Sequence, residues 1–192
     1  MRKLIVSQNV SLDGVMEAPD VWAFPYHGED VTQVLQEDMH ASDAMLFGRI
    51  TYESFAAFWP HQAEDPAGIV RHLNTTSKYV VSRTLQSVDW QNAMLIANDP
   101  LTEITNLKNK PGAQIVVTGS ATLVDWLLEH DLVDEIRLFV HPLVVGNGKR
   151  LFNGPLTSKR FELVDTHTFA SGVVLLRYGH EHSPAQTESN KR

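Results

Sequence analysis

The stretch FGRITYE at Phe47–Glu53 joins an apolar run to an amphipathic one through a single glycine. The run Ala44–Phe47 predicts a short buried strand, and Thr51–Phe58 predicts a helix that Trp59-Pro60 ends. A strand that passes at once into a helix is the repeating unit of α/β proteins. This stretch therefore predicts an α/β fold.

The same stretch is a candidate anion site. Free backbone N–H groups at a helix start attract anions, and the helix dipole adds to the attraction. Gly48 lets a phosphate approach the backbone, Arg49 adds a fork of donors, and Thr51 adds a hydroxyl. The alternative is an ordinary strand–helix turn with a solvated arginine, which this stretch taken alone favours.

Two more predicted strand ends carry similar residues. VSRT at Val81–Thr84 ends the expected strand Lys78–Ser82, and its serine and arginine suit a phosphate monoester such as the 2′-phosphate of NADPH. VVTGSATL at Val116–Leu123 ends the expected strand Gln114–Thr118, and the N–H groups of Ser120–Leu123 suit a pyrophosphate. The alternatives are a polar strand end and a serine that only caps its helix. Three such ends together favour a nucleotide-binding edge of a sheet.

The rest of the chain continues the alternation of strands and helices. Leu4–Leu12 alternates as a strand does, while Pro19–Gly28 and His61–Gly68 are expected to be loops. The other expected strands are Met94–Ala97, Asp134–Val140 and the hairpin of Phe161–Thr168 with Val173–Tyr178, and the other expected helices are Glu29–Ala41, Ile69–Asn74, Leu101–Lys108 and Ala121–Glu129. This order favours a mostly parallel sheet with helices on both faces and an antiparallel edge.

Two carboxylates are candidates for proton transfer. Asp13 follows the first strand in SLDG at Ser11–Gly14, where it could face a ligand; the alternative is an Asx turn, which Asp-Gly makes readily. Asp38 lies seven residues after Val31, on or beside the apolar face of its helix. There it could bond the N–H groups of a heterocycle, and the alternative is a helix-boundary carboxylate that reaches solvent.

Four aromatic side chains are candidates for a substrate pocket or for the core. They are Trp22, Phe24, Phe55 and Trp59. Aromatic residues near a flat ring and aromatic residues in a core look alike in sequence, so both interpretations stay open.

Composition excludes several classes of protein. With 192 residues, 43% of them hydrophobic, the chain can form one domain with its own core, and the lack of cysteine excludes disulfides and thiolate metal sites. A formal charge of −7 argues against nucleic acid as the main partner. No apolar stretch approaches the roughly 18–20 residues of a membrane span, so we expect a cytoplasmic protein. Nine histidines without an H-E-x-x-H pattern predict no metal site.

At this point the sequence resembles a known family, the dihydrofolate reductase-like proteins, and among them stand-alone relatives of the C-terminal reductase domain of the bifunctional riboflavin-biosynthesis deaminase-reductase. The resemblance runs from about Lys3 to Tyr178, and its most specific part is the block LVDEIRLFVHPLVVGNGKRLF at Leu132–Phe152. SLDG, LFGRITYE, KYVVSRTL and VTGS are in matching order. The zinc-deaminase half is absent, because H-A-E and P-C-x-x-C elements are missing.

The resemblance implies a dihydrofolate reductase-like fold over residues 1–179, with a sheet of about eight strands. Residues 180–192 are polar and without periodicity, so we expect them to form a disordered tail. It implies NADPH across the strand ends and a homodimer to which Leu132–Leu151 contributes. Carried over by motif, the cofactor-binding residues are Ser7, Gly14, Gly48, Arg49, Thr51, Val81, Ser82, Arg83, Thr118, Gly119, Ser120, Ala121, Thr122 and Leu123. Asp13 borders the nicotinamide, and Asp38 lies closer to the Gly48-Arg49 motif than the pterin-binding acid of the family should.

Together these observations predict an NADPH-dependent reductase. It would transfer a hydride to a C=N or C=O group of a small heterocycle, either an aminouracil riboside or a pterin-like ring. The alternative is an NADPH-binding protein without efficient catalysis, which acts as a redox sensor or binding module.

Overall fold

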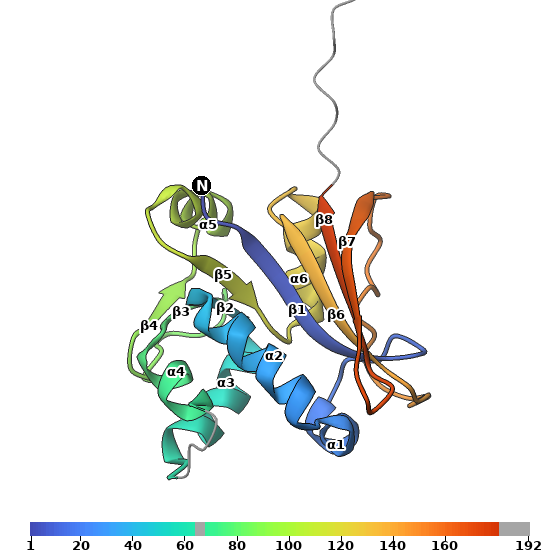
Figure 1. Cartoon of the computed structure of the whole chain (residues 1–192). Helices are drawn as coiled ribbons and strands as arrows, with labels where there is room; N and C mark the ends of the chain where they lie inside the picture. Colours follow the sequence, from blue (N-terminus) through green and yellow to red (C-terminus); the bar gives the residue numbers. More distant parts are fainter. Residues whose placement is uncertain (64–67, 181–192) are drawn as a thin grey trace, which may run out of the picture.

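The computed structural model describes residues 1–63 and 68–180 as an eight-stranded sheet with helices on both faces (Figure 1). The strand order is β4-β3-β2-β5-β1-β6-β8-β7, in which the first six strands are parallel, and β8 and β7 add an antiparallel edge. The strands are β1 (Leu4–Ser11), β2 (Ser42–Gly48), β3 (Ser77–Val81), β4 (Ala93–Ile96), β5 (Gln114–Val117), β6 (Glu135–His141), β7 (Phe161–Thr168) and β8 (Val174–His180).

The helices divide between the two faces of the sheet. They are α1 (Pro19–Trp22), α2 (Glu29–His40), α3 (Arg49–Phe58), α4 (Ile69–Thr75), α5 (Pro100–Asn109) and α6 (Ala121–Glu129), with short 3₁₀ turns at Phe24–Tyr26 and Trp59–His61. One core joins α5 and α6 to β1, β2 and β5. On the other face, α3 and α4 pack on β2 and β3, while α2 packs on β6 and β8.

Alternation explains which side chains of β1 face each layer. Leu4, Val6 and Val10 belong to the core under α5 and α6, so every second residue of β1, starting from Ile5, faces the opposite side, toward α2. Ser7 and Asn9 therefore lie on the α2 side of the sheet. Helix α2 crosses this side diagonally (Figure 1).

The predicted fold class and most predicted elements are confirmed, and Ala121–Glu129 matches α6 residue for residue. The expected irregular loop Pro19–Gly28 was wrong in part, because it contains α1 and a 3₁₀ turn. Each of these begins with a proline at its first or second position, where the ring's fixed φ suits a helix. His180, expected in the tail, is the last residue of β8.

Some predictions fall outside the described residues. They concern part of the loop 61–68 and the tail from residue 181 onward. Within residues 1–63 and 68–180, no helix is long and apolar enough to cross a membrane.

Candidate functional site

Helices α3 and α6 begin side by side, just beyond the carboxyl ends of two central strands. Strands β2 and β5 are parallel neighbours, with Leu46 opposite Val117, so α3 and α6 start from adjacent strand ends. The two helices then pack on opposite faces of the sheet. In open α/β sheets, ligands bind beyond the carboxyl ends of the strands at such a point of divergence.

The two helix starts interlock through Ser120. Its Oγ accepts a hydrogen bond from the Gly48 N–H at 2.9 Å and lies 2.6 Å from Oγ1 of Thr51. A Cβ on Gly48 would lie 2.8 Å from the Ser120 Oγ, and a Cβ on Gly119 would lie 2.6 Å from the Thr51 Oγ1. Gly119 also has a φ of +66°. Glycine is therefore needed at both positions, because a larger residue would collide with the other loop. The hydroxyl groups of Thr51 and Ser120 point toward each other.

Gln8 fixes the same loop from β1, and the sequence analysis did not identify it. Its side-chain amide donates to the Gly119 carbonyl at 2.9 Å and accepts from the Gly119 N–H at 3.0 Å. The side chain is buried. The sequence did contain one indication of this role. Gln8 is a polar residue on the face of β1 that otherwise carries core residues such as Val6 and Val10.

The first-turn N–H groups of α3 and α6 have no side-chain cap. Neither Gly48 nor Ser120 caps its own helix. By contrast, Asp99 caps α5 by accepting from the Thr102 N–H at 3.2 Å. Uncapped N–H groups at two adjacent helix starts are able to hold an anion. Arg49 is exposed beside them and pairs with Glu53 at 2.9 Å.

The Ser82-Arg83 turn lies beside the start of α3. Strand β3 pairs with β2 so that Val81 is opposite Gly48, which brings the predicted Val81–Arg83 next to the candidate anion site at the start of α3. The buried Ser82 Oγ accepts from the Thr84 and Leu85 N–H groups at 3.2 and 3.1 Å, which folds the turn. Arg83 is exposed, and no ion pair involves it among the described residues, so its guanidinium is available to a ligand.

Asp13 lies in a turn that it holds together. Its carboxylate accepts from the Ser11 hydroxyl at 2.7 Å and from the Val145 and Gly146 N–H groups at 3.1 and 3.0 Å. These bonds, the one from Ser11 first, lower the pKa of Asp13 to about 2. The group is therefore ionised at neutral pH and has no proton to donate. Its role in proton transfer stays a prediction, and its contacts favour a structural role.

Asp38 lies in a buried ion cluster between α2 and the sheet. Its Oδ1 is 2.7 Å from Arg137 and 3.4 Å from Arg177, and its Oδ2 is buried without a partner. Burial raises the pKa of Asp38, while the two guanidiniums oppose this rise. Arg137 is opposite Ser7 in the β1–β6 pairing, so the cluster brings Asp38 toward the predicted nicotinamide edge.

The four predicted pocket aromatics do not form one wall. Phe55 and Trp59 lie together, with ring centroids 6.1 Å apart, in the core under α3. Trp22 is buried against His141 at the end of β6, and Phe24 is 61% exposed.

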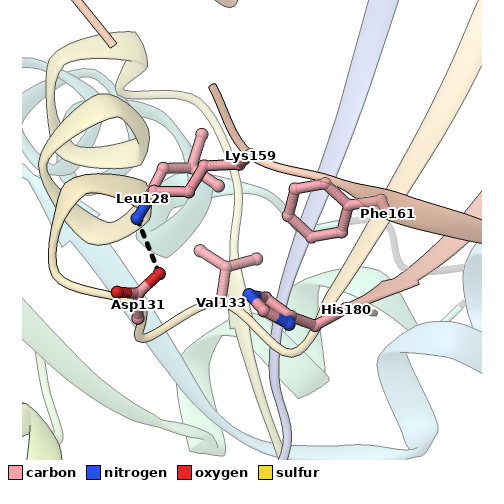
Figure 2. A pocket seen from close by; sticks show the side chains of 6 residues that line it. All are labelled: Leu128, Asp131, Val133, Lys159, Phe161 and His180. Carbon is pink, nitrogen blue, oxygen red and sulfur yellow. Dashed lines mark hydrogen bonds and ion pairs between the residues drawn. The ribbon is translucent and has the colours of Figure 1, made fainter. Parts of the chain in front are cut away.

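Two hollows lie among the described residues, and neither is lined by Gly48, Gly119 or Ser120. One, of about 730 Å³, is on the outer flank of α3, where Tyr52, Glu53 and Trp90 contribute to its lining. Figure 2 shows the other, a crevice where Lys159 and Asp131 pair at 2.7 Å beside Phe161 and His180. Within residues 1–63 and 68–180, no three His, Asp or Glu side chains gather as a metal site would need.

Comparison with known proteins identifies a matching family model and a similar sequence. Residues 2–175 match the family model described as the RibD C-terminal domain. The chain is 33% identical to the uncharacterized protein YyaP of Bacillus subtilis over 186 residues, which covers 92% of this chain and 94% of that protein.

Two solved structures share the fold. One is dihydrofolate reductase of Enterococcus faecalis complexed with NADP(H), with a TM-score of 0.65, 14% identity, and coverage of 94% of this chain and 97% of that one. The other is the deaminase/5-amino-6-(5-phosphoribosylamino)uracil reductase of Thermotoga maritima, with a TM-score of 0.63, 14% identity, and coverage of 93% and 56%.

Proposed function

The chain belongs to the family of the RibD C-terminal domain, and on that premise we propose that it is an oxidoreductase that uses NADPH to reduce a small heterocyclic substrate. The observation that carries the proposal is the interlocked pair of uncapped helix starts with Arg83 beside them. When bound, NADPH supplies the hydride.

The residues at the strand ends suit the parts of this cofactor. The N–H groups of Ala121 and Thr122, which open α6, would hold the pyrophosphate, whereas the Leu123 N–H already donates to the Ser120 carbonyl at 2.8 Å. Arg49 would add positive charge once its guanidinium leaves Glu53. Arg83 would hold the 2′-phosphate through its free guanidinium. The hydroxyls of Thr51 and Ser120 already face each other, so we assign them to holding the loops rather than the phosphates.

The substrate half of the site is proposed on the α2 side of β1. Ser7 and Asn9 face this side, and the Oδ1 of Asn9 is buried without a partner. Asp38 is the proposed proton-transfer group in preference to Asp13, because burial raises its pKa and leaves one carboxylate oxygen unpaired. A C=N or C=O group of an aminouracil or pterin-like ring is the proposed hydride acceptor.

The proposal is tested by turnover. Purified protein is mixed with NADPH and with either the phosphoribosylamino-uracil named for the Thermotoga relative or dihydrofolate, and loss of NADPH absorbance is followed. Turnover by the wild type, retained in Gly146→Ala and lost in Gly119→Ala, supports the proposal. NADPH binding without turnover of either compound would favour the redox-sensor alternative, and absence of NADPH binding would overturn both.

We also propose a homodimer, through the β7 edge. Strand β6, which the expected Leu132–Leu151 interface contains, lies inside the sheet between β1 and β8. Strand β7 is outermost, and its Leu163 and Val164 are 53% and 69% exposed. A free edge strand with exposed apolar side chains is a usual site of association. Light scattering should give twice the mass of the chain, and Leu163→Lys should give a monomer; a monomeric wild type would exclude the dimer.

A further inference from the structure

His141 is enclosed by three rings from one segment of chain. It is the last residue of β6, opposite Ser11 at the end of β1, and it is completely buried. Ring centroids lie 5.3 Å away for Trp22 and 5.8 Å away for both Tyr26 and His27. These three residues belong to residues 17–28, which we call the covering segment. It therefore closes over the ends of β1 and β6, and its ring contacts with the sheet centre on His141.

Both histidines of this cluster lack a partner at Nε2. His141 uses Nδ1 to donate to the Phe139 carbonyl at 2.9 Å, so its Nε2 carries no proton in the neutral ring. That Nε2 and the Nε2 of His27 are buried without partners. The cluster therefore holds the His141 ring with one nitrogen bonded to the backbone and the other buried without a partner, as suits a neutral imidazole.

No carboxylate among the described residues is close enough to stabilise a protonated His27 or His141 ring. Burial lowers the pKa of His27, and the neighbouring His141 lowers it further. Burial also lowers the pKa of His141 against the effect of its backbone bonds. The groups in ring contact are the phenol of Tyr26 and the indole of Trp22. Among the described residues, none of the carboxylates acts on either imidazole.

The covering segment is held mainly from inside. Its outer residues Val21 and Phe24 are 74% and 61% exposed, whereas Trp22 and Ala23 are buried. At its start, Glu17 accepts from the Lys149 N–H at 3.1 Å, which would keep that end attached. Ala18 then has a φ of 49°, a left-handed conformation that a residue with a Cβ adopts only under constraint. Release of the inner contacts would relieve this constraint.

We propose that His27 and His141 form a pH-sensitive latch that releases the covering segment from the ends of β1 and β6 when they take up protons. The sign follows from linkage, because the closed state disfavours the charged rings and the open state lets water solvate them. The closed state is thus fully favoured above the ordinary histidine pKa of 6.5, and it loosens as the pH falls below that value. Each proton taken up should raise the opening constant by up to about tenfold per pH unit.

Hydrogen exchange on the full chain tests the latch, without any substrate or cofactor. Amide exchange in residues 17–28 is compared with exchange in β2 at about pH 7.5 and about pH 5.5, after correction for the intrinsic pH dependence. Wild type should open about tenfold or more at the lower pH. The exposed-histidine control His61→Gln should behave in the same way.

Two variants make the proposal falsifiable. His141→Phe keeps a ring and removes one of the two titrating groups, so the pH dependence of opening should fall to that of the single proton of His27. His27→Gln should reduce the dependence to that of a single proton, and it serves if His141→Phe does not fold. The latch is overturned if wild-type residues 17–28 are equally protected at both pH values. Unchanged pH dependence in His141→Phe, or in His27→Gln when that variant must serve, would also overturn it.

Discussion

Gly119→Ala should damage the interlocked helix starts more than a glycine replacement elsewhere. The alanine would have to adopt a left-handed φ of +66°, and its Cβ would lie 2.6 Å from Oγ1 and 2.8 Å from Cγ2 of Thr51. The left-handed conformation costs about 1–2 kcal/mol, and the overlap adds about 1–3 kcal/mol. The expected loss of unfolding free energy is therefore about 2–5 kcal/mol.

Gly146→Ala is the matched control, because it separates conformation from contact. Gly146 has a φ of +84° and nothing within 4 Å of an added Cβ, so its replacement should cost only about 1–2 kcal/mol. A second test uses Thr51→Ala, which removes both close atoms and leaves a contact at 3.3 Å. In that background, Gly119→Ala should also cost only about 1–2 kcal/mol.

The unfolding free energies are measured by urea denaturation of the wild type, Gly119→Ala, Thr51→Ala and the double variant, which form a double-mutant cycle, and of Gly146→Ala. We expect a coupling free energy of about 1–3 kcal/mol between Gly119→Ala and Thr51→Ala. NADPH affinity should fall in Gly119→Ala and stay near the wild-type value in Gly146→Ala. Equal costs of Gly119→Ala with and without Thr51, or a cost no greater than that of Gly146→Ala, would refute the interlocking of the two loops.

Three further predictions concern stability. Tyr52→Phe should cost about 1–3 kcal/mol in urea denaturation, because the phenol oxygen accepts from the Asp89 and Trp90 N–H groups at 2.9 and 3.0 Å; an unchanged midpoint would contradict this. Burial lowers the pKa of Lys78 to about 8 from 10.5, so wild-type stability should rise relative to Lys78→Met between those values, and parallel pH profiles would argue against it. Asp13→Asn should lower the melting temperature at neutral pH, with a difference that shrinks as the pH falls from 3.8 toward about 2; a constant difference would be inconsistent with the hydrogen bonds of Asp13.

Local patterns were enough to predict the architecture. Alternation identified β1, and helical spacing identified α2, because each element buries one face and its sequence repeats with its own period. The run Ala121–Glu129 was predicted to the residue, since Gly119-Ser120 marks its start and an apolar stripe fills it. The 3₁₀ turn and α1 within Pro19–Gly28 were missed because both are short and contain prolines, which the sequence shares with loops.

Contacts between distant parts of the chain could not be predicted. The bond from Gly48 to Ser120 depends on β2 and β5 becoming neighbours, which no local pattern specifies. The amide pair of Gln8 with Gly119 depends on β1 lying next to β5 for the same reason. Trp22 was a candidate for a substrate pocket or for the core, and its packing on His141 depends on the covering segment folding over β6.

The most direct test of the proposed function is calorimetric titration with NADPH and with NADH, on the wild type, Arg83→Ala and the exposed control Arg160→Ala. A charged contact of about 1.5–3 kcal/mol from Arg83 corresponds to a preference for NADPH of roughly ten- to a hundredfold. The account predicts that wild type and Arg160→Ala show this preference, while Arg83→Ala binds both nucleotides with the same weak affinity. Failure of the wild type to bind either nucleotide, or a preference that survives in Arg83→Ala, would contradict it.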